Sequence, residues 1–206
     1  MDATFLLIIE IIGTIAFAVS GIRLAAAKSF DWFGAFIVGL VTAIGGGTMR
    51  DLLLGAPVFW MHSFWYIAVT ALSMFAVILL KKYLVKLNHT IFIFDTIGLA
   101  LFVVLGVQKS LAYGYPMWVA IMMGTMTGAF GGVIRDILIN EEPLIFRKDI
   151  YATACIIGGL IYWLILELGG DDILQQSVCG LSVILIRFLA VRYNWTLPTF
   201  RNFPLS

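Results

Sequence analysis

Seven apolar stretches, each about 20 residues long, take up most of this chain. A helix needs about 20 mostly apolar residues to cross the hydrocarbon core of a bilayer, whereas a membrane β-strand needs about ten residues of alternating polarity. The stretches are continuously apolar, which favours helices. We therefore predict an all-α membrane protein with seven transmembrane helices, near residues 4–22, 33–54, 64–81, 90–108, 117–139, 150–168 and 175–193.

The composition supports a single transmembrane domain over residues 1–206, because the connections between the stretches are short. The chain is 62% hydrophobic and 12% charged, against about 45–50% and about 25% in a soluble domain. A net charge of +1 provides no basic surface for nucleic acid. Cys155 and Cys179 both lie in apolar stretches, which does not favour a disulfide framework.

No pattern in the sequence points to an enzyme or to a cofactor. The glycine triplet at 45–47 is not followed by the Lys-Ser/Thr pair of a nucleotide-binding loop. The chain has neither a nucleophile elbow nor a His-Glu-x-x-His motif. Its two histidines, His62 and His89, have no second ligand at a metal-binding spacing, so no metal site is expected.

Lysines and arginines in the connections predict the orientation of the chain, because basic loops of membrane proteins stay in the cytoplasm. On one side the connections contain Lys109 alone. On the other side they contain nine basic residues, which are Arg23, Lys28, Lys81, Lys82, Lys86, Arg147, Lys148, Arg192 and Arg201. We therefore expect the N-terminus outside and the C-terminus in the cytoplasm. Arg187, inside the last stretch, is expected to extend to the inner surface.

The sequence contains an internal repeat with an offset of 85 residues: GGTMRD at 46–51 matches GGVIRD at 131–136. The same offset pairs Glu10 with Asp95, Gly13 with Gly98, Phe17 with Phe102, Gly21 with Gly106, and Tyr66 with Tyr151. Three predicted helices therefore repeat, over about 4–82 and about 90–168, and the helix near 175–193 has no counterpart.

Because three is an odd number of spans, the second copy enters the membrane in the opposite orientation. Such inverted repeats commonly place a substrate or ion site near the middle of the membrane. A scaffold produced by gene duplication, without a transport path, is the alternative explanation of the same repeat.

This topology sorts the charged residues of the spans into two layers. The outer layer contains Glu10, Arg50 and Asp51, and the inner layer contains Asp95, Arg135 and Asp136. A charge at the bilayer centre costs at least about 2.5 kcal/mol, so such groups face the bundle interior and find partners. We predict ion pairs between Glu10 and Arg50 and between Asp95 and Arg135. The aspartates that follow the arginines point about 100° away on a helix and either cap a kink or bind elsewhere.

These ion pairs have two possible roles. They either lock neighbouring helices together or form charge layers that gate a conduction path, and the two roles are compatible.

The glycine runs Gly45-Gly46-Gly47 and Gly131-Gly132 are the second candidate feature. Each glycine in a helix interior costs about 1 kcal/mol relative to alanine, and a run of them favours opening of the hydrogen-bond ladder. Exposed carbonyl groups at membrane depth are tolerated beside water, where they can coordinate a cation. We therefore expect paired kinks that line an ion path, with Thr48 and Gly128 as further candidates. Close helix packing is the simpler explanation for Gly39, Gly124 and Gly128.

The two motifs GGGTMRD and GGVIRD, with seven helices arranged as three, three and one, resemble the trimeric intracellular cation channel family. The resemblance is to its prokaryotic branch, which overlaps families described by a glycine-transporter-like domain, and it covers about residues 4–193. It implies a homotrimer in the bacterial inner membrane, with one path for monovalent cations between the repeats of each subunit; K⁺ is the favoured ion and Na⁺ a further candidate. Animal members bind an inositol lipid after the first glycine run, where this chain has Thr48-Met49-Arg50-Asp51 instead.

Three functions therefore remain open from the sequence. The first is a K⁺-permeable channel in which Glu10–Arg50 and Asp95–Arg135 pairs keep the path near neutral and control its opening. The second is a secondary transporter for a small zwitterion such as glycine, whose two charges an arginine–carboxylate layer could hold. The third is a scaffold that conducts nothing.

Overall fold

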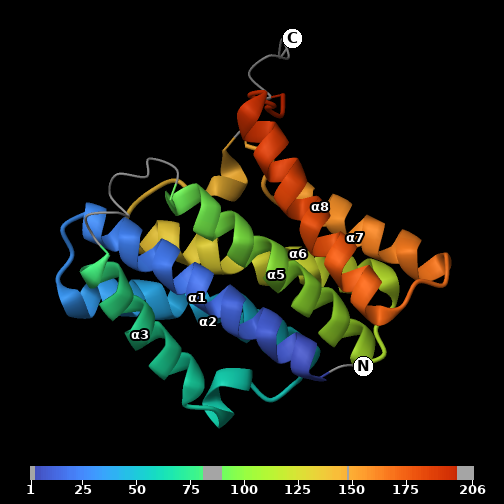
Figure 1. The fold of residues 1–206 in the computed structure, drawn as a ribbon, viewed down its shortest axis with the longest axis horizontal. Helices are drawn as coiled ribbons and strands as arrows, with labels where there is room; N and C mark the ends of the chain where they lie inside the picture. Colours follow the sequence, from blue (N-terminus) through green and yellow to red (C-terminus); the bar gives the residue numbers. More distant parts are fainter. Residues whose placement is uncertain (1–2, 81–89, 148, 199–206) are drawn as a thin grey trace, which may run out of the picture.

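The computed structural model describes residues 3–80, 90–147 and 149–198, and these contain seven α-helices and two short 3-10 helices (Figure 1). The α-helices are α1 (Ala3–Ala27), α2 (Trp32–Leu54), α3 (Trp65–Leu79), α5 (Thr90–Ala112), α6 (Met117–Leu138), α7 (Ala152–Glu167) and α8 (Asp172–Arg192). The 3-10 helices η1 (Phe59–His62) and η2 (Leu144–Phe146) precede α3 and α7. The all-α class is confirmed, and the largest error in the predicted ends is at α1, which continues to Ala27.

Five of the described helices, α1, α2, α5, α6 and α8, are long and apolar enough to cross a membrane. The helices α3 and α7 are apolar but contain only 15 and 16 residues. At about 1.5 Å per residue they are shorter than a hydrocarbon core of about 30 Å. The end of the third predicted span and five basic residues of the orientation argument lie outside the described residues; these are Lys81, Lys82, Lys86, Lys148 and Arg201.

Local sequence signals explain where α2 begins and ends. Asp31 precedes the helix, and its carboxylate accepts a hydrogen bond of 2.6 Å from the backbone N–H of Gly34. Such a cap satisfies one of the amide groups that the first helical turn leaves without a partner. Gly55 ends the helix in the left-handed conformation, with φ of 66°, which glycine adopts without a steric penalty.

The centre of the molecule is the antiparallel pair α1 and α5, and α3 lies on one side of this pair with α7 and α8 on the other (Figure 1). The rings of Phe17 and Phe102 stack between the two helices, with centroids 5.2 Å apart and planes 11° from parallel. These residues are partners in the repeat. Each ring also packs on the glycine of the opposite copy, Phe17 on Gly98 and Phe102 on Gly13, because no side chain separates the two helices there.

Interactions within the first copy recur 85 residues later with the same atoms. Thr42 donates its hydroxyl hydrogen to the Val38 carbonyl at 2.6 Å, and Thr127 does the same to Met123 at 2.6 Å. The backbone N–H of Ala56 bonds to the Asp51 carbonyl at 2.8 Å, as that of Glu141 bonds to Asp136 at 2.8 Å. The sequence repeat is thus also a repeat of local structure.

An ion pair between connections joins the two copies. Lys28, after α1, contacts Glu141, after α6, and Arg147 lies 3.6 Å from the same carboxylate. The hydrogen bond and the charge from Lys28 lower the pKa of the Glu141 carboxyl below its usual value. The carboxylate is therefore charged in the folded protein down to a lower pH than in the unfolded chain, and the contact is lost as the pH falls through this lowered pKa.

We predict a small effect of Glu141→Gln on the pH dependence of stability, because the ion pair is exposed and screened by salt. Below the ordinary pKa of glutamic acid, about 4.3, the melting temperature of the natural protein should fall slightly more than that of the variant. Melting curves at several pH values measure this. Glu142→Gln, which changes the neighbouring exposed carboxylate, is the control, and an equal effect of both variants would contradict the assignment.

Candidate functional site: two buried charge clusters

Two clusters of charged residues lie at opposite ends of the α1–α5 pair. The Arg50 cluster consists of Glu10, Arg50, Asp51, Tyr66 and Lys109. The Arg135 cluster consists of Asp95, Arg135, Asp136, Tyr151 and Arg187. Four members of each cluster correspond through the offset of 85, and Lys109 and Arg187 do not. The structure thus places all six predicted charge-layer residues in the two clusters.

Arg135 is the centre of its cluster and is 1% exposed. Its Nη1 atom lies 2.6 Å from Asp95 Oδ1, so the predicted pair between α5 and α6 is confirmed. Its Nε atom donates to Asp136 Oδ1 at 2.8 Å, and Nη1 also donates to the Ser20 hydroxyl of α1 at 2.8 Å. The guanidinium therefore connects three helices, α1, α5 and α6.

Asp51 and Asp136, which follow the two arginines, make equivalent hydrogen bonds in the two copies. Asp51 Oδ2 accepts the backbone N–H of Phe59 at 3.0 Å, and Asp136 Oδ2 accepts that of Leu144 at 3.2 Å. Phe59 and Leu144 are the first residues of η1 and η2. Each aspartate thus holds its own arginine with one oxygen and the following 3-10 helix with the other.

Arg187 is a member of the Arg135 cluster that the sequence analysis missed. Its Nη2 atom lies 3.2 Å from Asp95 Oδ2, and its guanidinium covers the rings of Phe92 and Tyr151 at 5.0 and 4.7 Å. The expectation that it extends to the membrane surface is wrong, because the residue is 4% exposed. The sequence did contain a signal: Cys179, Gly180, Val183, Arg187 and Ala190 recur at helical spacing and form the buried stripe of α8.

The predicted ion pair between Glu10 and Arg50 is also wrong. Arg50 instead bonds to its neighbour Asp51, with Nη2 2.7 Å from Oδ1, and the guanidinium lies 5.7 Å from the centre of the Phe59 ring. Lys109, which we placed in a connection, is near the end of α5, and its ammonium lies 2.8 Å from the same Asp51 oxygen. Asp51 therefore neutralises cations from both repeats, while Glu10 interacts with the Tyr66 side chain.

The two clusters differ in access to water. A cavity of about 290 Å³ adjoins the Arg50 cluster, lined by Leu6, Glu10, Arg50, Phe59, Tyr66, Leu105, Gln108, Lys109 and Ala112. Glu10 is half-buried, and the Lys109 side chain is 27% exposed. In the Arg135 cluster no member is more than 4% exposed. Because Arg187 comes from α8, which has no counterpart in the first copy, only the Arg135 cluster contains this additional guanidinium.

The glycine runs lie in unbroken helices, so the expected opening of the hydrogen-bond ladder is wrong. Their role in the fold is a close crossing of α2 and α6. A Cβ atom at Gly46 would overlap the Thr127 carbonyl, and one at Gly131 would overlap the Thr42 carbonyl. The absence of side chains thus lets the two backbones touch.

The remaining candidates for the ion path have assigned contacts as well. A Cβ atom at Gly47 would meet the Phe59 ring, one at Gly132 would lie 2.7 Å from the Tyr151 hydroxyl, and one at Gly128 2.9 Å from the Leu99 carbonyl. The Thr48 hydroxyl donates to the Ile44 carbonyl at 2.8 Å and accepts from the Trp60 indole at 2.9 Å. Together with Gly45 it lines a groove of about 320 Å³ between α2 and α6. A role of these residues in ion passage stays a prediction.

Comparison with known proteins shows where this arrangement recurs. A family model described as "Glycine transporter" matches residues 7–82 and 92–167. The "UPF0126 membrane protein" of Vibrio cholerae is 43% identical over 202 residues, which cover 97% of this chain and 84% of the relative. The "UPF0126 inner membrane protein YadS" of Escherichia coli K12 is 40% identical over 195 residues, 93% of this chain and 94% of the relative.

The deciding comparison is with a solved structure. The trimeric intracellular cation channel orthologue from Rhodobacter sphaeroides superposes with a TM-score of 0.88 at 31% identity, over 93% of this chain and 99% of that one. The chain belongs to the trimeric intracellular cation channel family. The resemblance inferred from the two glycine and Arg-Asp motifs is therefore confirmed.

Membership in the trimeric intracellular cation channel family agrees with three further expectations. The family model matches two stretches, 7–82 and 92–167. The second begins and ends 85 residues after the first, which is the offset of the internal repeat. Similar solved structures are ion channels and not enzymes, as the lack of a catalytic motif predicted. The relatives are membrane proteins, and one is an inner membrane protein.

Proposed function

We propose that this protein is a K⁺-permeable channel for monovalent cations in the bacterial inner membrane. The observation that carries this proposal is the similarity in sequence and fold, over nearly the whole chain, to a trimeric intracellular cation channel orthologue. The proposed assembly is a homotrimer, as the word trimeric in that protein's name suggests. Sodium is a second candidate ion, and no cofactor is required.

The proposed ion path lies within each subunit, between two inverted three-helix repeats that with α8 make seven spans. Two contacts support an inverted arrangement. Ser20, late in α1, bonds to the Arg135 cluster beside the start of α5, and Leu6, early in α1, shares a cavity with Ala112 at the end of α5. The equivalent first helices of the two copies are therefore antiparallel. In the proposed orientation the N-terminus is outside and the C-terminus is cytoplasmic, so the Arg50 cluster lies towards the outside.

Balanced charges would allow cations to pass two arginine-containing clusters. An arginine beside a cation path repels cations unless a carboxylate compensates it. The Arg50 cluster has two cations, Arg50 and Lys109, and two carboxylates, Glu10 and Asp51. The Arg135 cluster likewise has two of each sign. In our proposal the path runs between the clusters beside the glycine-rich crossing of α2 and α6, where the backbones are in contact in this structure. The geometry of the ion pairs controls the opening of the path.

Single-channel recording of Arg50→Ala and Arg135→Ala in planar bilayers tests the role of the clusters. We expect each variant to change conductance or open probability, because each leaves at least one carboxylate with less compensation. Arg192→Ala removes an arginine at the end of α8 and serves as the control. Unchanged conductance and open probability in both cluster variants, with normal expression, would contradict the proposal.

A zwitterion transporter is the second candidate, and one observation favours it. The cavity of the Arg50 cluster presents Arg50 and Lys109 together with Glu10, and the buried Gln108 carbonyl oxygen beside it has no hydrogen-bond partner among the described residues. These groups could hold the carboxylate and the ammonium of glycine. The description of the matching family model points to the same substrate.

Flux measurements on one preparation separate these functions. Purified protein in liposomes is assayed for K⁺ flux and for glycine uptake side by side. We expect K⁺ flux without glycine and no saturable glycine uptake. Glycine uptake with no independent K⁺ flux would favour the transporter, and the absence of both activities would favour a scaffold.

A further inference from the structure

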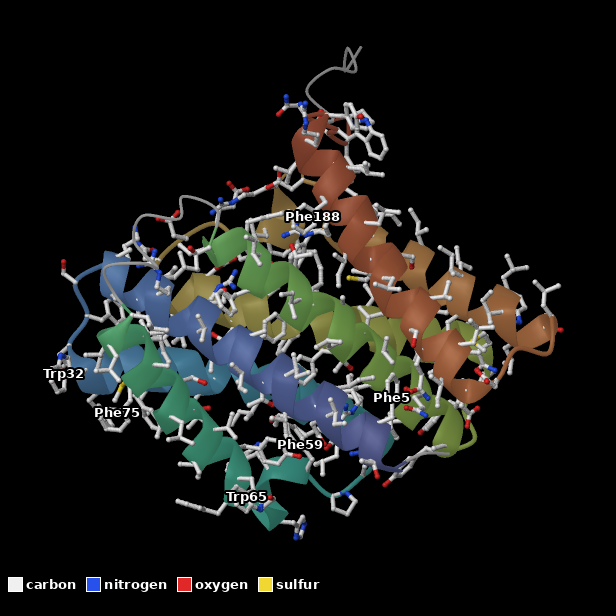
Figure 2. All side chains as sticks on the ribbon, in the orientation of Figure 1. Phe5, Trp32, Phe59, Trp65, Phe75 and Phe188 are labelled. Atoms are coloured by element: carbon white, nitrogen blue, oxygen red, sulfur yellow. The ribbon has the colours of Figure 1, made fainter. Side chains whose placement is uncertain are left out.

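A groove between α1 and α3 is separate from the α2–α6 crossing. It has a volume of about 370 Å³ and its lining is almost entirely apolar. The lining residues are Leu7, Glu10, Ile11, Thr14, Ser63, Trp65, Tyr66 and Val69. Its rim lies on the outside of the described subunit: Trp65 is on the periphery in Figure 2, and Leu7 and Trp65 are 55% and 75% exposed. The α1–α3 groove is therefore open at the surface of the described subunit.

Glu10 is an unusual residue for the wall of such a groove. The other carboxylates of the two clusters each contact a cation within 4 Å: Asp51 contacts Arg50 and Lys109, Asp95 contacts Arg135 and Arg187, and Asp136 contacts Arg135. Within the part of the chain that the structure describes, Glu10 has no such ion pair, and its side-chain partner is the neutral Tyr66. Arg50 and Lys109 line the neighbouring cavity with Glu10 but form their ion pairs with Asp51, so the Glu10 carboxylate has room for a further cation at contact distance on the side of the groove.

We propose that the α1–α3 groove binds amphipathic monocations with a single alkyl chain and an ammonium head group. The ammonium lies against the Glu10 carboxylate, and the alkyl chain lies along Leu7, Ile11 and Val69. Charge complementarity selects the head group, because a carboxylate that faces an apolar groove and has no ion pair within 4 Å among the described residues favours a cation over a neutral group. The apolar lining selects the chain, and the volume falls within the range of small-molecule sites, about 300–1,000 Å³.

This site adjoins the cavity of the Arg50 cluster. Glu10 and Tyr66 line both the α1–α3 groove and that cavity, so the same two side chains separate them. A cation bound at Glu10 from the membrane side therefore lies in the wall of the proposed ion path. The binding itself does not depend on the proposed function, but one consequence does: if the path conducts, bound alkylammonium should reduce the flux of K⁺.

Photolabelling tests the binding without any assay of transport. The protein, in nanodiscs of neutral phospholipid, is exposed to decyltrimethylammonium with a photoreactive diazirine in its chain, and the labelled peptides are identified by mass spectrometry. We expect labels around Ile11 and Val69. Glu10→Gln should reduce this labelling at least tenfold, and Glu142→Gln, which removes an exposed carboxylate elsewhere, should leave it unchanged.

A second variant and a neutral probe make the test decisive. Val69→Trp fills the groove and keeps Glu10, so it should also abolish labelling; melting temperature and gel-filtration profile verify that each variant is folded. Equal labelling of folded Glu10→Gln would overturn the proposal. So would equal labelling by a neutral probe with the same chain, since the groove would then hold any lipid chain. Labels confined to other helices, or crosslinks showing that a second copy of the chain covers the groove, would overturn it as well.

Discussion

Replacing Arg135 with alanine should destabilise the folded protein by about 3–5 kcal/mol, the magnitude for breaking a buried ion pair by removal of one partner. The arginine is 1% exposed and bonds to Asp95, Asp136 and Ser20. Its removal leaves two buried carboxylates with one guanidinium, that of Arg187, between them. The cost is high because neither carboxylate can reach water.

The matched control for this prediction is the equivalent arginine of the first copy. Arg50→Ala should be less destabilising than Arg135→Ala, since Lys109 still compensates Asp51 and a cavity adjoins the cluster. Equilibrium unfolding in mild detergent, followed by tryptophan fluorescence, measures both free energies of unfolding. Equal losses in the two variants would show that the burial of the Arg135 cluster does not have the energetic consequence we assign to it.

Adding one methyl group at Gly46 should have the second-largest effect. A Cβ atom there would overlap the backbone carbonyl of Thr127 in α6. A flexible side chain could move aside, but a backbone carbonyl in a helix cannot move without displacing the helix. We expect Gly46→Ala to cost at least about 3 kcal/mol, the upper end of the usual range for overpacking, although alanine has the higher helix propensity.

The same substitution at two other helical glycines, Gly45 and Gly180, isolates the cause of the Gly46 effect. At Gly45 the nearest atom to an added Cβ is the end of the Ile134 side chain at 3.1 Å, and at Gly180 it is a Val104 methyl at 3.6 Å. Gly45→Ala should therefore be mild and Gly180→Ala neutral or stabilising. Thermal melting of the three purified variants gives the order. A melting temperature of Gly46→Ala close to that of Gly180→Ala would contradict the close crossing of α2 and α6.

Periodic features of the sequence were the ones that predicted the structure well. The helix positions follow from apolar stretches whose length the bilayer dictates. The pair Asp95–Arg135 was predicted because charges buried at the same depth find partners. The duplication aligned Phe17 with Phe102 but did not predict that their rings stack. The duplication also accounts for the equivalent 3-10 helices that Asp51 and Asp136 hold, although the sequence analysis did not predict these contacts.

Features that break the repeat could not be predicted in the same way. Lys109 and Arg187 have no charged counterpart at the offset of 85, and each bonds to an aspartate far away in the sequence. Lys109 contacts one oxygen of Asp51, and Arg50 bonds to the same oxygen. Arg50 therefore pairs with Asp51 and not with the predicted partner, Glu10. The choice between two carboxylates depends on side-chain positions within a few ångströms, which helical periodicity does not specify.

The sequence by itself determined the all-α class, the positions of the seven helices, the internal repeat and the family. The physical reason is that span length, apolar periodicity and a duplicated motif are properties of the chain that need no packing partner. Only the tertiary structure decided that the glycine runs support a close helix crossing and that α8 places Arg187 in the Arg135 cluster. It also left Glu10 with a neutral partner. These outcomes depend on which helices touch and on which of several charges lies nearest, and both are set by the packing of the whole bundle.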